Sequence, residues 1–116
     1  MEKKKDIGAV WVVAELKDTG LQAVSLQLIG KARKLADQLG VAVEAVLLGE
    51  QVSEAARLLI ASGVDTLYLG ESADLKVYQS DIYAEIIVEL AKEHEPEILL
   101  LGSTFMGREL APIIAA

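Results

Sequence analysis

The residues best suited to chemistry lie in a short stretch near the carboxyl end of the chain. Ser103 and Thr104 are followed by Gly107 and Arg108, just before an apparent helix start at Gly107 or Arg108. Free N–H groups at such a start, beside two hydroxyls and a guanidinium, suit a phosphate or carboxylate. Alternatively, Ser103 and Thr104 cap the helix while Arg108 pairs with Glu109 or with an acid of a neighbouring domain. Capping is the commoner arrangement.

Five further side chains are weaker candidates. Glu15 follows the first predicted strand, where it could contact a ligand or bond to another domain, although a structural role is favoured. Trp11 lies within that strand and is expected in the core. His94 ends a predicted helix, where a cation complements the dipole, and Tyr78 and Tyr83 flank a helix start as packing residues. Because no nucleophile–base pair, carboxylate dyad or metal cluster can be assembled, the chain is expected to be a binding or scaffold module and not an enzyme.

The composition excludes several classes of protein. The chain has 116 residues, 53% of them hydrophobic and 25% charged, with a net charge of -7, no cysteine and one histidine. It is too apolar to be disordered and too acidic to favour nucleic acid. Thiolate zinc sites and iron–sulfur clusters are impossible, and a histidine metal site is not expected. No apolar run approaches the length of a membrane span, and the absence of a targeting signal favours a cytoplasmic, bacterial-type protein.

Short apolar runs alternate with helical patterns along the chain. Strands are expected at 8–14, 41–48, 66–69 and 98–101, with helices at 24–39, 53–62, 80–95 and from about 107 onward. Ser53 and Ser80 are expected to be N-caps, and Gly30 to mark close packing inside the first helix. This order predicts an α/β domain over residues 7–116, with a three-layer, doubly wound, mostly parallel sheet and helices on both faces, after a flexible tail at 1–6.

The loops after the first two strands lack nucleotide fingerprints. Residues 15–20 contain neither the G-x-G-x-x-G spacing nor the phosphate loop G-x-x-x-x-G-K-[ST]. Residues 49–52 carry an acid and an amide, which do not favour an anion, and that loop is expected to be structural.

Several ordered motifs resemble one family. The runs 10–15, 24–33 and 45–49 and the stretch from Gly102 to Pro112 are similar to the N-terminal domain of electron transfer flavoprotein alpha subunits, over nearly the whole chain from Asp6 to Ala116. The resemblance implies a Rossmann-like fold of the adenine nucleotide alpha hydrolase-like kind. It also implies a heterodimer with a beta subunit that carries electrons from flavin dehydrogenases, such as acyl-CoA dehydrogenases, to a quinone reductase or a bifurcating partner.

The resemblance places the cofactors mainly outside this chain. FAD belongs to the C-terminal domain of the alpha subunit, and AMP or a second FAD belongs to the beta subunit, so that no flavin contact is assigned here. Thr104 and Arg108 match the family's motif and are expected to order the loop or contact the beta subunit.

The apolar stretch from Leu110 to Ala116 has no helix stop. We therefore expect the chain to be a truncated subunit without its FAD domain, in which at least one more strand would follow. The alternative is a self-standing adenine-nucleotide-binding module resembling universal stress proteins, which would use Gly102 to Arg108 on a phosphate. That loop, however, lacks their longer glycine-serine signature.

Overall fold

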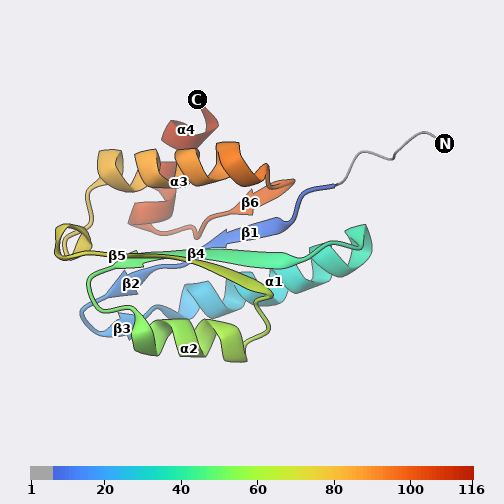
Figure 1. Cartoon of the computed structure of the whole chain (residues 1–116), viewed down its shortest axis with the longest axis horizontal. Helices are drawn as coiled ribbons and strands as arrows, with labels where there is room; N and C mark the ends of the chain where they lie inside the picture. Colours follow the sequence, from blue (N-terminus) through green and yellow to red (C-terminus); the bar gives the residue numbers. More distant parts are fainter. Residues whose placement is uncertain (1–6) are drawn as a thin grey trace.

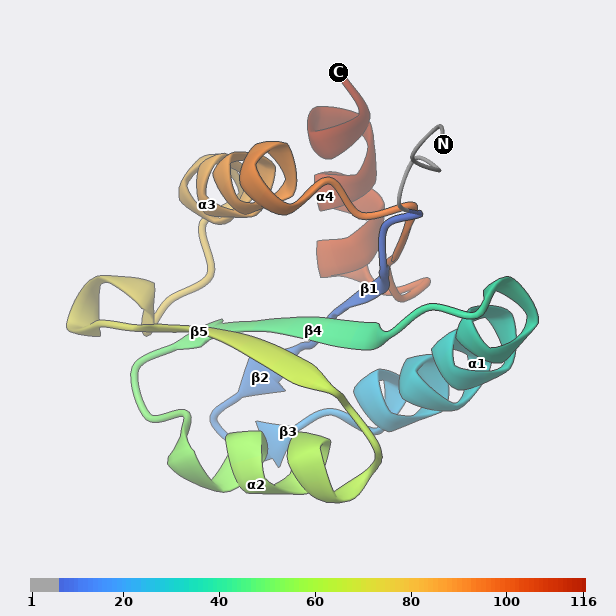
Figure 2. The same ribbon diagram turned by 45° about the vertical axis from the view of Figure 1, so that its right-hand side comes forward.

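The computed structural model describes residues 7–116, so the tail expected at 1–6 lies outside the described residues. A parallel four-stranded sheet forms its centre, with strand order β5-β4-β1-β6. Figures 1 and 2 show α1 and α2 on one face of this sheet and α3 and α4 on the other. The elements are β1 (Val10–Val13), β2 (Leu16–Lys17), β3 (Gly20–Leu21), α1 (Ala23–Leu39), β4 (Val43–Gly49), α2 (Ser53–Ala61), β5 (Thr66–Glu71), the 3-10 turn η1 (Ala73–Leu75), α3 (Ser80–His94), β6 (Ile98–Leu100) and α4 (Phe105–Ala115). The three-layer, doubly wound fold expected from the sequence is confirmed.

Strand β1 shows why this sequence forms a doubly covered sheet. All four of its residues are buried, and successive side chains point to opposite faces. Val10 and Val12 join the cluster packed beneath α1 and α2. Trp11 and Val13 join the cluster beneath α3 and α4. A continuous apolar run is therefore buried on both faces, as in other parallel sheets.

The path of the chain creates a switch point beside β1. The strands first proceed outward, from β1 to β4 to β5, and the chain then crosses to the free side of β1 to form β6. The loops after β1 and β6 consequently leave the same edge of the sheet in opposite directions. Such a position is where open α/β sheets bind ligands.

Three expectations about helix starts are wrong. Ser53 and Ser80 are the first helical residues, and the N-caps are Val52 and Gln79, neither of which makes a side-chain cap bond. At α2 the carboxylate of Glu71 accepts the backbone N–H of the N-cap residue itself, Val52, at 3.3 Å. Helix α4 begins at Phe105, two residues before the earliest start expected from its glycine and arginine.

Glycines mark both a confirmed and a failed expectation. Gly40 ends α1 with φ of 71°, the left-handed conformation expected of a glycine stop. Gly30, by contrast, is exposed, and apart from its chain neighbours and the backbone of its own helix, no described atom lies within 4 Å of a Cβ placed there. The close packing expected at Gly30 is therefore absent from the described part of the chain.

Candidate functional site

A carboxylate and a hydroxyl meet at the switch point. Glu15 follows β1 and Thr104 follows β6, and the two strands pair in parallel. Thr104 Oγ1 donates a hydrogen bond of 2.6 Å to Glu15 Oε2, across 89 residues of sequence. Glu15 is only 3% exposed, which is rare for an acid unless its charge is met by a donor. The structure thus brings together two of the residues singled out in the sequence.

The backbone of Glu15 is held by Ser25, a residue that was not singled out in the sequence. The Oγ of Ser25, a fully buried residue on α1, accepts the Glu15 N–H at 2.8 Å. The Glu15 carbonyl accepts the N–H of Gln22 at 2.9 Å. A polar residue on the apolar face of a helix was the available signal, because a buried hydroxyl needs a partner.

Two glycines allow the β6–α4 loop to close around this contact. A Cβ on Gly102 would lie 2.9 Å from Glu15 Oε2, and a Cβ on Gly107 would collide with the carbonyl oxygen of Gly102. The first turn of α4 therefore packs directly on the end of β6. Both glycines were noted in the sequence. Glycine is needed at these positions because the loop and the helix start pack too closely for a side chain, and not because a phosphate binds there.

Thr104 is also the N-cap of α4. Its Oγ1 accepts the Gly107 N–H at 3.0 Å, and its carbonyl accepts the Arg108 N–H at 2.9 Å. A helix N-terminus favours a nearby negative charge. Glu15 provides it, because its carboxylate accepts a hydrogen bond from the same Thr104 hydroxyl that caps α4. The capping interpretation is therefore supported for Thr104, whereas Ser103 is exposed and does not cap the helix.

Arg108 and Glu109 do not form the ion pair considered from the sequence. Arg108 is exposed, and its Nε donates to the Thr104 carbonyl at 3.3 Å. Glu109 Oε1 instead accepts the hydroxyl of Tyr78 at 2.7 Å. Burial and the Glu109 carboxylate together raise the pKa of Tyr78. Arg108 has no ion pair with any residue in the described range 7–116, so its charge faces outward.

Tyr78 and Tyr83 act as the packing residues that the sequence predicted. Their rings meet edge to face, with centroids 5.0 Å apart. The Tyr83 hydroxyl donates to the Leu75 carbonyl at 2.7 Å, and burial raises its pKa. This pair ties η1 to the start of α3.

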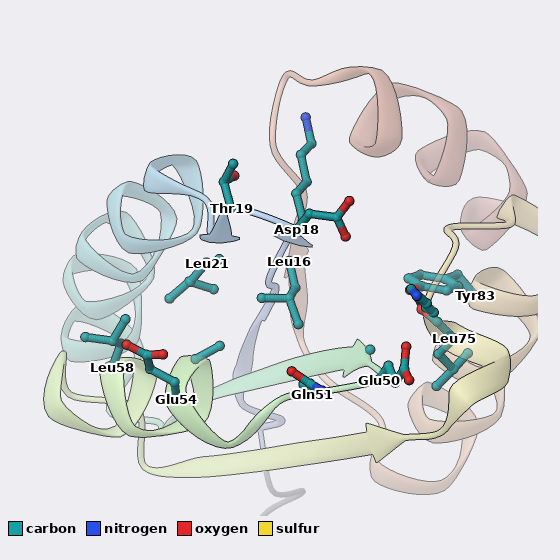
Figure 3. A pocket seen from close by; sticks show the side chains of 15 residues that line it. Leu16, Asp18, Thr19, Leu21, Glu50, Gln51, Glu54, Leu58, Leu75 and Tyr83 are labelled. Carbon is teal, nitrogen blue, oxygen red and sulfur yellow. The ribbon is translucent and has the colours of Figure 1, made fainter.

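A pocket of about 530 Å³ lies at the same edge of the sheet, beneath an unexpected hairpin. Strands β2 and β3 pair antiparallel, with Gly20 at φ of 107° in the turn. Figure 3 shows the hairpin above the loop that follows β4, with Leu16 pointing toward that loop. A Cβ on Gly49 would lie 2.7 Å from Leu16 Cδ2. The turn formers Asp18 and Gly20 were the sequence signal for this hairpin.

The charges around the pocket do not suit a phosphate. Asp18, Glu50 and Glu54 line it together with Lys17 and Lys76. The acids outnumber the bases, and Glu54 lies in the first turn of α2, where a phosphate would otherwise be favoured. The loop at 49–52, expected to be structural, thus forms one wall of the pocket.

The described residues do not fit a flavin or an adenine nucleotide. At the switch point the side chains of Glu15 and Thr104 bond to each other. Within residues 7–116, every fully buried side-chain polar atom has a hydrogen-bond partner, so none awaits a ligand. The same residues contain no group of three or more His, Cys, Asp or Glu side chains arranged to hold a metal ion. None of their helices has the length and apolar character needed to cross a membrane.

Comparison with known proteins identifies close relatives. The model of the electron transfer flavoprotein domain matches residues 10–116. The chain is 43% identical to the electron transfer flavoprotein subunit alpha of Clostridium acetobutylicum, over 97% of this chain and 34% of that protein. It is 44% identical to the same subunit of Thermoanaerobacterium thermosaccharolyticum, over 96% of this chain and 34% of that protein.

A third relative has a different name. It is the acryloyl-CoA reductase electron transfer subunit beta of Anaerotignum propionicum, 36% identical over 92% of this chain and 29% of that protein. The chain thus spans about a third of the length of the curated relatives it matches. Since the family's domain covers nearly all of the sequence and the relatives share more than a third of its residues, the chain belongs to the electron transfer flavoprotein family.

Proposed function

We propose that this chain is the N-terminal part of the alpha subunit of a heterodimeric electron transfer flavoprotein. In that complex it is a scaffold for the beta subunit and not itself a cofactor-binding domain. The observation that carries the scaffold role is the Thr104–Glu15 hydrogen bond. It places the protein's own carboxylate at the ligand position of the fold, where a second negative charge from a phosphate would be repelled.

The cofactors then belong to other parts of the complex. FAD is held mainly by the rest of the alpha subunit, and AMP or a second FAD by the beta subunit. The pocket and the switch point support this division, because acids outnumber bases in the pocket and the Thr104 side chain already accepts the Gly107 N–H at the start of α4. The electron donors are flavin dehydrogenases such as acyl-CoA dehydrogenases, and the acceptor is a quinone reductase or a bifurcating partner.

The surface around the start of α4 is the proposed contact with the beta subunit. Glu15, Thr104 and Gly107 hold the loop in place from within, while Ser103 and Arg108 face outward. Phe105, between these two, is 73% exposed. Aromatic residues and arginine are both enriched in protein–protein interfaces.

The domain itself is proposed to extend beyond this chain. Strand β6 pairs only with β1 among the described strands, and its residues are only half-buried. A parallel strand following α4 would pair with this edge through a right-handed crossover.

Purification of the natural complex tests the proposal. With a tag on this subunit, we expect a second subunit to co-purify and the visible absorption spectrum to show one or two bound flavins per heterodimer. An untagged-strain control identifies proteins that bind the resin alone. Recovery of this subunit without a partner and without a flavin spectrum would refute the assignment.

Paired variants test the contact surface. Arg108→Ala and Phe105→Ala should weaken retention of the beta subunit. The matched control is Arg57→Ala, because Arg57 is also exposed but lies on α2, across the sheet. Equal retention in all three variants would show that the start of α4 is not the contact surface.

The adenine-nucleotide module resembling universal stress proteins gains no support from the geometry. Its phosphate site would coincide with the loop that Glu15 and Thr104 already close.

A further inference from the structure

A cluster of aromatic side chains lies at the opposite end of the strands from the switch point. Trp11 of β1 and Tyr68 of β5 are on the face covered by α3 and α4, on either side of β4. Their ring centroids are 5.1 Å apart. Trp11 is the only tryptophan in the sequence and is fully buried.

One carboxylate oxygen joins the two rings. Glu44 lies on β4 opposite Trp11 in the strand register. Its Oε1 accepts the Trp11 Nε1–H at 2.9 Å and the Tyr68 hydroxyl at 3.1 Å. Both dissociable protons of the aromatic pair therefore point at the same acceptor atom, within ordinary hydrogen-bond distance.

The cluster extends toward the surface through His94. This imidazole lies 4.6 Å from the Tyr68 ring, centroid to centroid, and 6.2 Å from that of Trp11. Its side chain is 35% exposed. A continuous series of ring contacts thus leads from the buried indole to solvent.

We propose that Trp11, Tyr68 and Glu44 form a proton-coupled radical-transfer unit that moves an oxidising equivalent from the core toward the surface. A one-electron oxidant, in the cell an oxygen-derived radical, removes an electron from Trp11. The Nε1–H bond then breaks and its proton passes to Glu44 Oε1, which leaves a neutral indolyl radical.

The second step returns Trp11 to its resting state. Tyr68 gives one electron to the indolyl radical, its O–H bond breaks, and that proton passes to Glu44 as the first proton returns to Nε1. The result is an intact Trp11, a protonated Glu44 that holds the proton from Tyr68, and a neutral tyrosyl radical at Tyr68. A small thiol or ascorbate then gives one electron to this radical, the O–H bond forms again with the proton held by Glu44, and Glu44 returns to its carboxylate form.

The environment of Tyr68 makes the carboxylate necessary. Burial, together with Glu44, raises the pKa of Tyr68 to about 12, so the phenol keeps its proton at neutral pH. A phenol gives up an electron readily only when its proton can leave at the same time. The Glu44 oxygen supplies the acceptor, and it does so without any movement of the rings.

Flash photolysis of the whole chain tests the unit at its source. Light at the red edge of the indole band excites Trp11 but not tyrosine, and hexaamminecobalt(III) takes up the ejected electron irreversibly. We expect the absorption of the indolyl radical to decay as that of a tyrosyl radical rises, more slowly in D₂O than in H₂O. Absence of a tyrosyl radical in the unaltered chain overturns the proposal without any variant.

Three variants assign the residues, with circular dichroism confirming that each is folded. Tyr68→Phe keeps the ring and should abolish the tyrosyl radical, while Glu44→Gln keeps a hydrogen-bond acceptor and should slow its formation. Tyr83→Phe, the control, should change neither the yield nor the rate. An undiminished tyrosyl yield in Tyr68→Phe overturns the electron path, and an unchanged rate in Glu44→Gln overturns the role of the carboxylate.

Discussion

Replacing Thr104 with valine removes the contact at the switch point with little change in shape. The Thr104 hydroxyl donates to Glu15 and accepts from the Gly107 N–H. Valine has nearly the same volume and makes neither bond. Glu15 then remains buried and charged without its donor, and α4 loses its N-cap.

The size of the effect follows from these two losses. Removal of an N-cap costs about 1 kcal/mol, and loss of a hydrogen bond to a charged group costs about 2 kcal/mol. We therefore expect Thr104→Val to lower the free energy of unfolding by roughly 3 kcal/mol and Tm by roughly 10 °C. Thr104→Ser keeps the hydroxyl, loses one methyl group and should cost less than about 1 kcal/mol.

Urea denaturation followed by circular dichroism measures both variants. The midpoint should shift strongly for valine and weakly for serine, with the slope of the transition unchanged. The reasoning is refuted if the two variants are destabilised equally, since the methyl group and not the hydroxyl would then matter. It also fails if valine is as stable as threonine.

Three further predictions concern glycines and one surface acid. Gly107→Ala should destabilise by about 3 kcal/mol, because the new methyl collides with the Gly102 carbonyl. Gly30→Ala should stabilise by about 0.5–1 kcal/mol, because the helical site is exposed and unobstructed. Thermal melts measure the change in Tm of Gly107→Ala and Gly30→Ala. A change in the same direction for both variants would contradict the packing described. The hydrogen bond from the Val43 N–H, and to a smaller extent the Arg33 guanidinium, lower the pKa of Asp65 below its usual 3.8. Its stabilisation is thus full above that pH and lost as the pH falls through the lower folded-state pKa. Asp65→Asn should lower the free energy of unfolding by less than about 1 kcal/mol at neutral pH. The difference between the variant and the unaltered chain should disappear in acid. If urea titrations show that the difference persists in acid, its dependence on the ionisation of Asp65 is disproved.

The layered fold was predictable because its signals are local and consistent. Apolar runs such as Val10–Val13 need cover on both faces, and glycine stops such as Gly40 separate them from helices. The β2–β3 hairpin was missed because each of its strands has only two residues, too few for a periodic pattern. The true N-cap of α2 was missed because Val52 has no side-chain oxygen, and its own N–H is bonded instead by a carboxylate distant in sequence, Glu71.

The candidate site was predictable in its members but not in its connections. Glu15 and Thr104 were both visible as polar residues at strand ends, yet their contact spans 89 residues. It depends on β6 lying next to β1, which follows from topology and not from either local sequence. Ser25 was overlooked because its hydroxyl bonds to backbone within an otherwise apolar face.

Calorimetric titration of the chain with AMP and ATP tests most directly whether the switch point is closed by the protein's own carboxylate. With Glu15 bound to Thr104 and the helix start capped, we expect no heat of binding for either nucleotide. Micromolar binding that is lost in Arg108→Ala would contradict the scaffold role and identify a nucleotide-binding module instead.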